Sequence, residues 1–186
     1  MATKLEIFNM ALAKLGVPAV TSLNEESKER RFCSTFYDLA RDEILEQYPW
    51  HCCLMDDTLA PLVDAPEFKW DYQYDFPSDC LKIYSIYPDY IEYEVKNKKI
   101  YCNESSLQVT YHQQITDTSK FSAHVVNAIV QNLAIKLAFP LVQNSGLQKF
   151  LLEELNGMIL PRARGTDVFE GTPPSNEPDN WLNARL

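Results

Sequence analysis

Residues 125–140 read VVNAIVQNLAIKLAFP, a broad apolar stretch with helical spacing. Its apolar side chains recur at three- and four-residue steps, which places them on one face of an α-helix. Residues 117–119 offer N-cap oxygens before the stretch, and Pro140 ends it. We expect this helix to be the most buried element of the protein. Its apolar stripe consists of Val125, Ile129, Val130, Leu133, Leu137 and Ala138.

The N-terminal part of the chain carries the signals of two more helices. Residues 3–6 and 22–25 each have a capping-box pattern, in which a hydroxyl residue precedes a glutamate by three positions. Gly16 supplies a left-handed end for the first helix, and Pro49 follows the second. Residues 1–50 are therefore expected to form a helical hairpin.

A fourth helix is expected to begin at Asn144 or Ser145 and to end near Pro161. Residues 117–160 then form a second helical pair, and the two pairs together predict a four-helix bundle. Facing stripes of a bundle bury one another, so the stripe of residues 125–137 should contact the first pair. The contacting residues are expected to be Phe8, Leu12, Phe36 and Tyr37.

Within residues 51–116, the stretch from Tyr72 to about Tyr111 changes from helical spacing to alternation and is rich in β-branched and aromatic residues. We expect an inserted antiparallel sheet of four to five short strands, which makes the fold class α+β. One hairpin turn is crowded with cations, at Lys96, Lys98 and Lys99 around Asn97. These residues are either a solvated tip or a tip that faces a partner or a channel.

Residues 161–186 contain several prolines and glycines among polar residues, a composition that cannot maintain a packed core. We expect an extended C-terminal arm. The arm ends on apolar and cationic anchors that either dock on another subunit or fold back on the same domain. These candidate interface residues are Trp181, Leu182, Arg185 and Leu186.

The overall charge argues against nucleic-acid capture. Across 186 residues, 26 acidic and 17 basic residues give a formal net charge of -9 and a pI near 4.8, so the protein repels phosphates. The N-terminus mixes Lys and Glu into its apolar positions, unlike a signal peptide, and we expect a soluble intracellular protein without a membrane span. The five cysteines are expected to be reduced thiols.

Residues that could carry chemistry have simpler explanations in each case. Cys52 and Cys53 beside His51 lack the spacing of a zinc site, and His112 and His124 lack a partner at ligand spacing. The chain has five glycines and no phosphate-binding loop, so no cofactor and no metal are expected. One enzymatic alternative is a carboxylate pair of a glycan hydrolase. Its candidate residues are Asp38, Asp42, Glu43, Glu46, Asp56 and Asp57.

Several local patterns, in this order, resemble the head-to-tail adaptor family of short-tailed phages, also called tail tubular protein A. The opening helix FNMALAKLG spans residues 8–16, and the corner YPW spans residues 48–50. The run WDYQYDFPSDCL at residues 70–81 is similar to the family's entry into the sheet. The remaining matches are VTY at residues 109–111, Thr116-Asp117, the helix of residues 128–138 and WLNAR at residues 181–185.

The resemblance implies a structural virion protein and not an enzyme. Such an adaptor forms a homo-oligomeric ring, typically of twelve copies, beneath the portal protein, and it joins the capsid to a downstream tail protein. Double-stranded DNA passes through the ring during ejection without specific binding. The protein would be assembled in the cytoplasm of the bacterial host and would lie in the neck of the virion. The alternatives are a phage-associated cell-wall glycan hydrolase and a generic soluble protein-interaction module.

Overall fold

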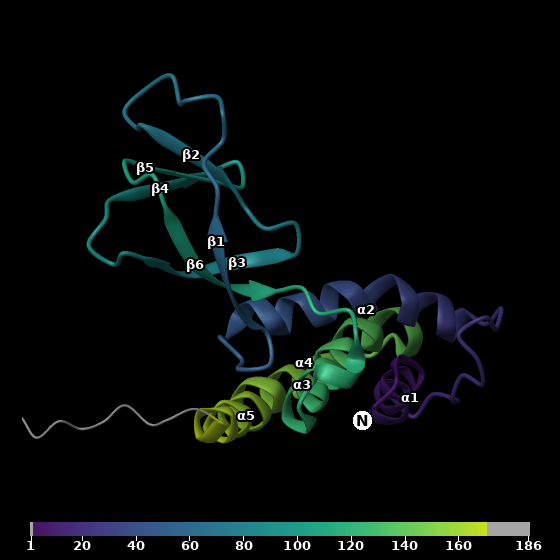
Figure 1. The fold of residues 1–186 in the computed structure, drawn as a ribbon. Coiled ribbons are helices and arrows are strands. Elements are labelled where there is room, and N and C mark those ends of the chain that lie inside the picture. The colour runs from purple at the N-terminus through teal and green to yellow at the C-terminus, as the bar shows by residue number, and fades with distance from the viewer. Residues whose placement is uncertain (1, 171–186) are drawn as a thin grey trace, which may run out of the picture.

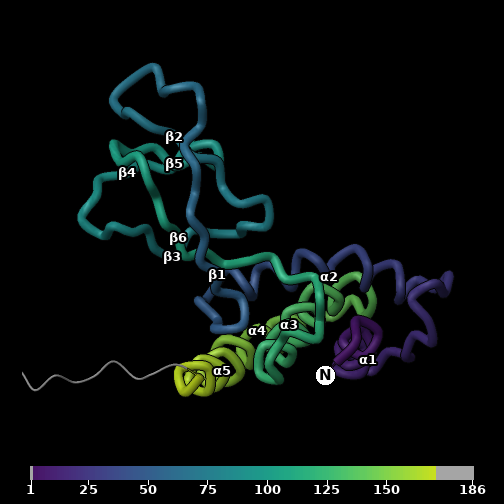
Figure 2. Tube along the Cα trace, in the orientation of Figure 1, coloured from purple at the N-terminus to yellow at the C-terminus, as the bar shows by residue number. Residues whose placement is uncertain are grey.

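The chain folds into a helical body and a β unit that stands on one side of it (Figure 1). The computed structural model describes residues 2–170. The helical body contains both ends of the described chain, and the β unit is inserted between its second and third helices. The tube in Figure 2 shows that the chain enters and leaves the β unit at neighbouring points.

Within residues 2–170, five α-helices, two π-helical turns and the short 3-10 turns Thr118–Lys120 and Val168–Glu170 form the helical body. The turn Ala138–Val142 follows α3, and the turn Leu155–Ile159 joins α4 to α5. The helices are α1 (Lys4–Lys14), α2 (Lys28–Gln47), α3 (Ala123–Leu137), α4 (Ser145–Glu154) and α5 (Leu160–Asp167).

The expected four-helix bundle is wrong, because α3 is a central helix that is buried on nearly every side. In a bundle each helix buries one stripe. Here α3 contacts α1, α2, α4 and α5, and two of its polar residues, Gln131 and Asn132, are buried. The amide of Gln131 donates to the Leu151 carbonyl at 2.8 Å, and that of Asn132 donates to the Ala40 carbonyl at 2.9 Å.

The expected burial of the α3 stripe is confirmed. Val125, Ile129, Leu133 and Leu137 are fully buried in one cluster with Phe8, Leu12 and Tyr37, and Phe36 packs against that cluster half-buried. The stretch Ala123–Val142 also has the length and mean hydropathy, 1.6, of a membrane span, and 67% of it is buried inside the fold. That burial is typical of the core helix of a soluble protein.

Helix boundaries differ from the sequence expectations at two places. The capping box of Thr3 and Glu6 forms and Gly16 is left-handed, as expected. The pattern at Ser22 instead makes a turn, and α2 begins later with Ser27 as its N-cap. Pro161 does not end the last helix, because it lies in the first turn of α5. An extended arm beginning at residue 161 is therefore wrong as far as Asp167.

The β unit contains two three-stranded antiparallel sheets instead of one sheet of four to five strands. The first has the order β1-β6-β3, and the second has the order β2-β5-β4. The strands are β1 (Leu54–Leu59), β2 (Tyr72–Asp75), β3 (Cys80–Tyr87), β4 (Tyr93–Lys96), β5 (Lys99–Cys102) and β6 (Leu107–Gln113).

The two sheets share a second, smaller core. Tyr74, Ile100 and Cys102 from one sheet contact Leu107 and neighbouring residues from the other. A pair of small sheets can enclose apolar side chains between their facing surfaces, which a single short sheet cannot do. The β unit therefore has its own core in addition to the cluster around α3.

Candidate functional site

A tight corner after α2 joins the helical body to the β unit. Trp50 is fully buried there, and its indole N–H donates to the Ile44 carbonyl at 2.7 Å. Its ring meets Tyr48 edge to face at 4.7 Å between centroids. These contacts fix the corner, and with it the position of His51 at the base of β1.

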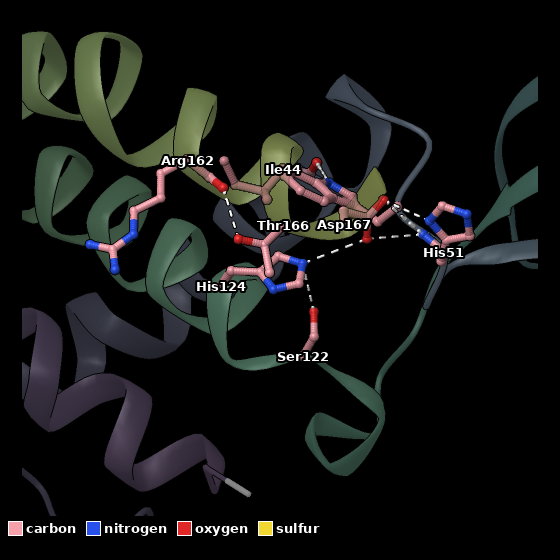
Figure 3. A network of polar contacts seen from close by, with 8 residues as sticks. Ile44, His51, Ser122, His124, Arg162, Thr166 and Asp167 are labelled. Carbon is pink, nitrogen blue, oxygen red and sulfur yellow. Dashed lines mark hydrogen bonds and ion pairs between the residues drawn. The ribbon is translucent and has the colours of Figure 1, made fainter. Parts of the chain in front are cut away.

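A fully buried carboxylate fastens this corner to the end of α5. One oxygen of Asp167 lies 2.9 Å from Nδ1 of His51, and both oxygens accept from the His51 main-chain N–H at 3.2 and 3.3 Å (Figure 3). The other oxygen lies 3.5 Å from Nε2 of His124 on α3. We call these three residues the Asp167 clamp.

A serine, Ser122, lies beside the clamp, but the geometry is not that of a proton relay. Ser122 Oγ lies 3.0 Å from Nε2 of His124, the same nitrogen that faces Asp167. A Ser-His-Asp relay needs the serine and the carboxylate on opposite ring nitrogens. The clamp instead joins α3, α5 and the corner before β1, which is a structural task.

The thiols in the described chain are suited to packing and not to nucleophilic chemistry. All five are free. Burial raises the pKa of Cys33 and Cys53 to about 12, and it raises the pKa of Cys52 and Cys80 to about 11. A thiol attacks as its thiolate, so these groups remain unreactive near neutral pH.

His112 is also a buried structural residue. Its Nδ1 donates to the Leu45 carbonyl at 2.8 Å, which ties β6 to α2. Burial, with a smaller effect of Lys82, lowers the pKa of His112 below its ordinary value. The imidazole is therefore neutral in the folded protein at neutral pH.

The carboxylates considered for glycan hydrolysis make local structural contacts. Asp38 and Asp42 both pair with Arg41, at 3.0 and 2.7 Å. Glu43 pairs with Lys136 at 2.7 Å. On the β unit Asp56 accepts from the Thr110 hydroxyl at 2.6 Å. These contacts explain the positions of the four carboxylates that they involve, and they assign none of these carboxylates to a reaction.

The lysine-rich hairpin tip forms at the expected residues. Asn97 and Lys98 have φ angles of 50° and 57°, which are left-handed, and they connect β4 to β5 in a two-residue turn. Such a turn matches the twist of the flanking strands. Lys96 pairs with Glu94 at 2.8 Å and Lys99 lies 3.9 Å from Asp75, so part of the positive charge of the tip is balanced locally.

A depression on the β unit has a volume of about 510 Å³. Its lining includes Phe68, Trp70, Glu94 and Tyr101. The Trp70 indole donates to Glu94 at 3.2 Å, and the Lys69 ammonium lies 4.4 Å from the centroid of the Trp70 ring. The mixture of exposed aromatic and charged side chains suits contact with another protein.

Comparisons with known proteins assign no family. No known protein family matches the chain, and no curated protein matches it either. The assignment of function therefore depends on the residues themselves and on the sequence resemblance.

The expected arm residues Trp181, Leu182, Arg185 and Leu186 lie outside the described residues. Sequence reasoning overlooked Asp167, because its partners His51 and His124 are distant along the chain. Its one local signal is an acidic residue at the C-terminal end of a helix, where the helix dipole disfavours negative charge. Such a residue needs specific donors, and the clamp supplies them.

Proposed function

We propose that this chain is a structural head-to-tail adaptor of a tailed bacteriophage. Copies of the chain form a ring, typically of twelve, between the portal protein and a downstream tail protein. The ring joins the capsid to the tail, and double-stranded DNA passes through its centre during ejection. This function follows the sequence resemblance, and the architecture of the described chain is compatible with it.

The observation that carries the proposal is the two-part architecture. A helical body enclosed around α3 carries a β unit that stands away from it (Figure 1). The β unit exposes large apolar and aromatic side chains, which in soluble proteins mark contact surfaces. These side chains are Met55, Val63, Phe68, Tyr84, Tyr87, Tyr90, Tyr93 and Val95.

The charge of the chain agrees with a channel that DNA must leave quickly. A ring of copies that each carry -9 repels phosphate and does not retain it. Lys96, Lys98 and Lys99 are the candidates for attracting phosphate within this acidic protein. A cationic tip facing the channel or the tail protein would guide DNA locally. The C-terminal residues from Trp181 to Leu186 are the candidate clasp to the portal or to a neighbouring adaptor.

Negative-stain electron microscopy of the protein with its cognate portal tests the proposal directly. We expect a ring of density attached to one face of the portal, whether or not the isolated protein is monomeric. Portal particles that remain bare at saturating concentrations of the protein would refute the adaptor function. A wall-lysis assay on the same preparation tests the hydrolase alternative, and we expect no lysis above buffer.

A further inference from the structure

The two sheets have four outer edges, and three of them are protected. Gln113 N–H donates to Cys53 C=O at 2.7 Å. Because main-chain groups alternate in direction along a strand, the odd-numbered residues of β1 bond to β6, and the N–H and C=O groups of its even-numbered residues point away from the sheet. The outward N–H of Thr58 donates to the Asp57 carboxylate at 2.8 Å. An edge that is acidic and already bonded is poorly suited to accept another strand.

The edges of β2 and β3 are protected by other means. The outward C=O of Gln73 on β2 accepts from the Leu62 N–H at 2.8 Å, so the preceding segment covers that edge. β3 has two register shifts against β6, one between Cys80 and Lys82 and one between Ile83 and Ser85. Such bulges bend and twist a strand, which discourages further pairing.

The edge of β4 has no such protection. Phe76 N–H donates to Lys98 C=O at 3.1 Å. Main-chain groups of even-numbered residues of β5 therefore bond to β2, and those of odd-numbered residues bond to β4. The main-chain groups of Tyr93 and Val95 on β4 consequently point outward. Within residues 2–170, no hydrogen bond engages them.

The side chains along the β4 edge are also apolar and about half exposed to solvent. Tyr93 and Val95 are 50% and 45% exposed, and they lie opposite Cys102 and Ile100, which are fully buried in the core of the β unit. Residues opposite each other on paired strands share a face. A strand added beside β4 would therefore extend the sheet and cover this apolar rim.

The C-terminal residues 179–186, DNWLNARL, have the composition of such a strand. They contain no proline, so every main-chain N–H is available. Leu182, Ala184 and Leu186 alternate with Trp181, Asn183 and Arg185, which would place three aliphatic residues on one face and Trp181 with two polar residues on the other. The apolar face would lie beside Tyr93 and Val95.

The polar face of β4 offers Arg185 a carboxylate beside the cation Lys96. Glu94 lies on the opposite face of β4 from Val95, and its carboxylate is held by the Trp70 indole at 3.2 Å and the Lys96 ammonium at 2.8 Å. Arg185 would lie on the same face as Glu94, and a guanidinium can pair with a carboxylate in two parallel hydrogen bonds. Glu92 adds a second negative charge next to the strand.

We propose that β4 of one copy accepts residues 179–186 of a neighbouring copy as an added β-strand. The choice of a neighbouring copy rests on the proposed ring, since a head-to-tail contact that closes requires each subunit to give one element and receive another. Main-chain hydrogen bonds provide the affinity of such strand addition, and alternating side chains provide its specificity.

Disulfide cross-linking between two single variants of the full-length chain, mixed in the presence of the cognate portal, tests this pairing. One preparation carries Glu94→Cys and the other carries Asn183→Cys, so a heterodimer on non-reducing gels requires contact between copies. Wild type mixed with either variant controls for the native thiols. We expect a heterodimer whose yield falls about tenfold when Ala184→Pro is added to the donor, because proline removes an N–H that points to β4.

Two matched variants separate pairing from folding. Ala184→Ser keeps the N–H and should keep the cross-link. Val95→Pro on the receiving copy removes an outward N–H that β5 does not use, so it should abolish the cross-link with little effect on the thermal midpoint. If Val95→Pro fails to fold, the donor variant Ala184→Pro still decides the question, because its site lies outside the described fold.

Three outcomes overturn the proposal. The first is a heterodimer yield that Ala184→Pro leaves unchanged, and the second is no heterodimer at all. The third is an intrachain disulfide in a variant that carries both cysteines on one chain, while mixed single variants give no heterodimer. The last result would mean that the segment folds back on its own copy. Failure here is distinct from failure of the adaptor function, because portal-bound rings that survive Ala184→Pro would refute the strand pairing and leave the adaptor in place.

Discussion

Replacing Asp167 by alanine should destabilise the protein by about 3–6 kcal/mol, because it removes a buried carboxylate that accepts two hydrogen bonds. Its side chain is fully buried, and it accepts from the His51 imidazole at 2.9 Å and from the His51 main-chain N–H at 3.2 Å. A hydrogen bond to a charged group contributes about 1.5–3 kcal/mol, so two such bonds give this range.

Asp167→Asn gives a graded version of the same test. The asparagine keeps one carbonyl acceptor in nearly the same shape, and we expect it to cost about half as much as the alanine variant. Urea unfolding measures both. Asp89→Ala serves as the control, since Asp89 is exposed and should change the free energy of unfolding by less than about 0.5 kcal/mol.

Hydrogen exchange locates the effect. In Asp167→Ala the amides of His51 and of α5 should exchange before those of α3, because the clamp joins those two segments. A loss of less than about 1 kcal/mol in Asp167→Ala, or exchange that is unchanged at His51, would show that the carboxylate does not fasten the corner to the helix.

Three more predictions concern the core, the pH dependence and the thiols. Leu133→Ala should cost about 2–5 kcal/mol because Leu133 is fully buried, whereas Leu152→Ala, at an exposed position on α4, should cost about 1 kcal/mol or less in the same urea melts. Since burial lowers the pKa of His112 when the protein folds, the unfolded chain binds the proton more readily, and the free energy of unfolding should fall as the pH drops below 6.5. His112→Asn, which can still donate to the Leu45 carbonyl, should flatten that profile, and an unaltered slope would contradict this explanation. A chelator and a reductant should leave the thermal midpoint unchanged, and stoichiometric zinc by elemental analysis would count against a metal-free fold.

Local signals could be predicted from the sequence because both partners lie within a few residues. The capping box of Thr3 and Glu6 and the left-handed turn at Asn97 and Lys98 are examples. Strand β1 could not be recognised, because its exposure on both faces removes the apolar alternation that identifies a strand. Its pairing with β6 joins residues far apart along the chain, such as Leu54 and His112, and so the division into two sheets was missed.

The failure at Pro161 has a specific physical cause. Proline lacks the N–H that a continuing helix needs, so it normally ends or kinks the helix. Here the π-helical turn Leu155–Ile159 precedes it, and α5 effectively restarts with Pro161 in its first turn, where no hydrogen bond from that N–H is required. The composition of residues 155–161 does not predict a π-helical turn. The helix continues because Leu155 and Ile159 pack into the core.

The clamp and the proposed strand pairing are physically linked through the end of α5. Asp167 fixes that end against the corner from which β1 rises, and the described chain finishes only three residues later at Glu170. A segment that leaves from a fixed point has fewer positions to sample than one attached to a fraying helix, so less entropy is lost when it docks. Under the proposed strand pairing, the clamp would contribute to assembly as well as to stability, even though none of its atoms would touch the neighbouring copy.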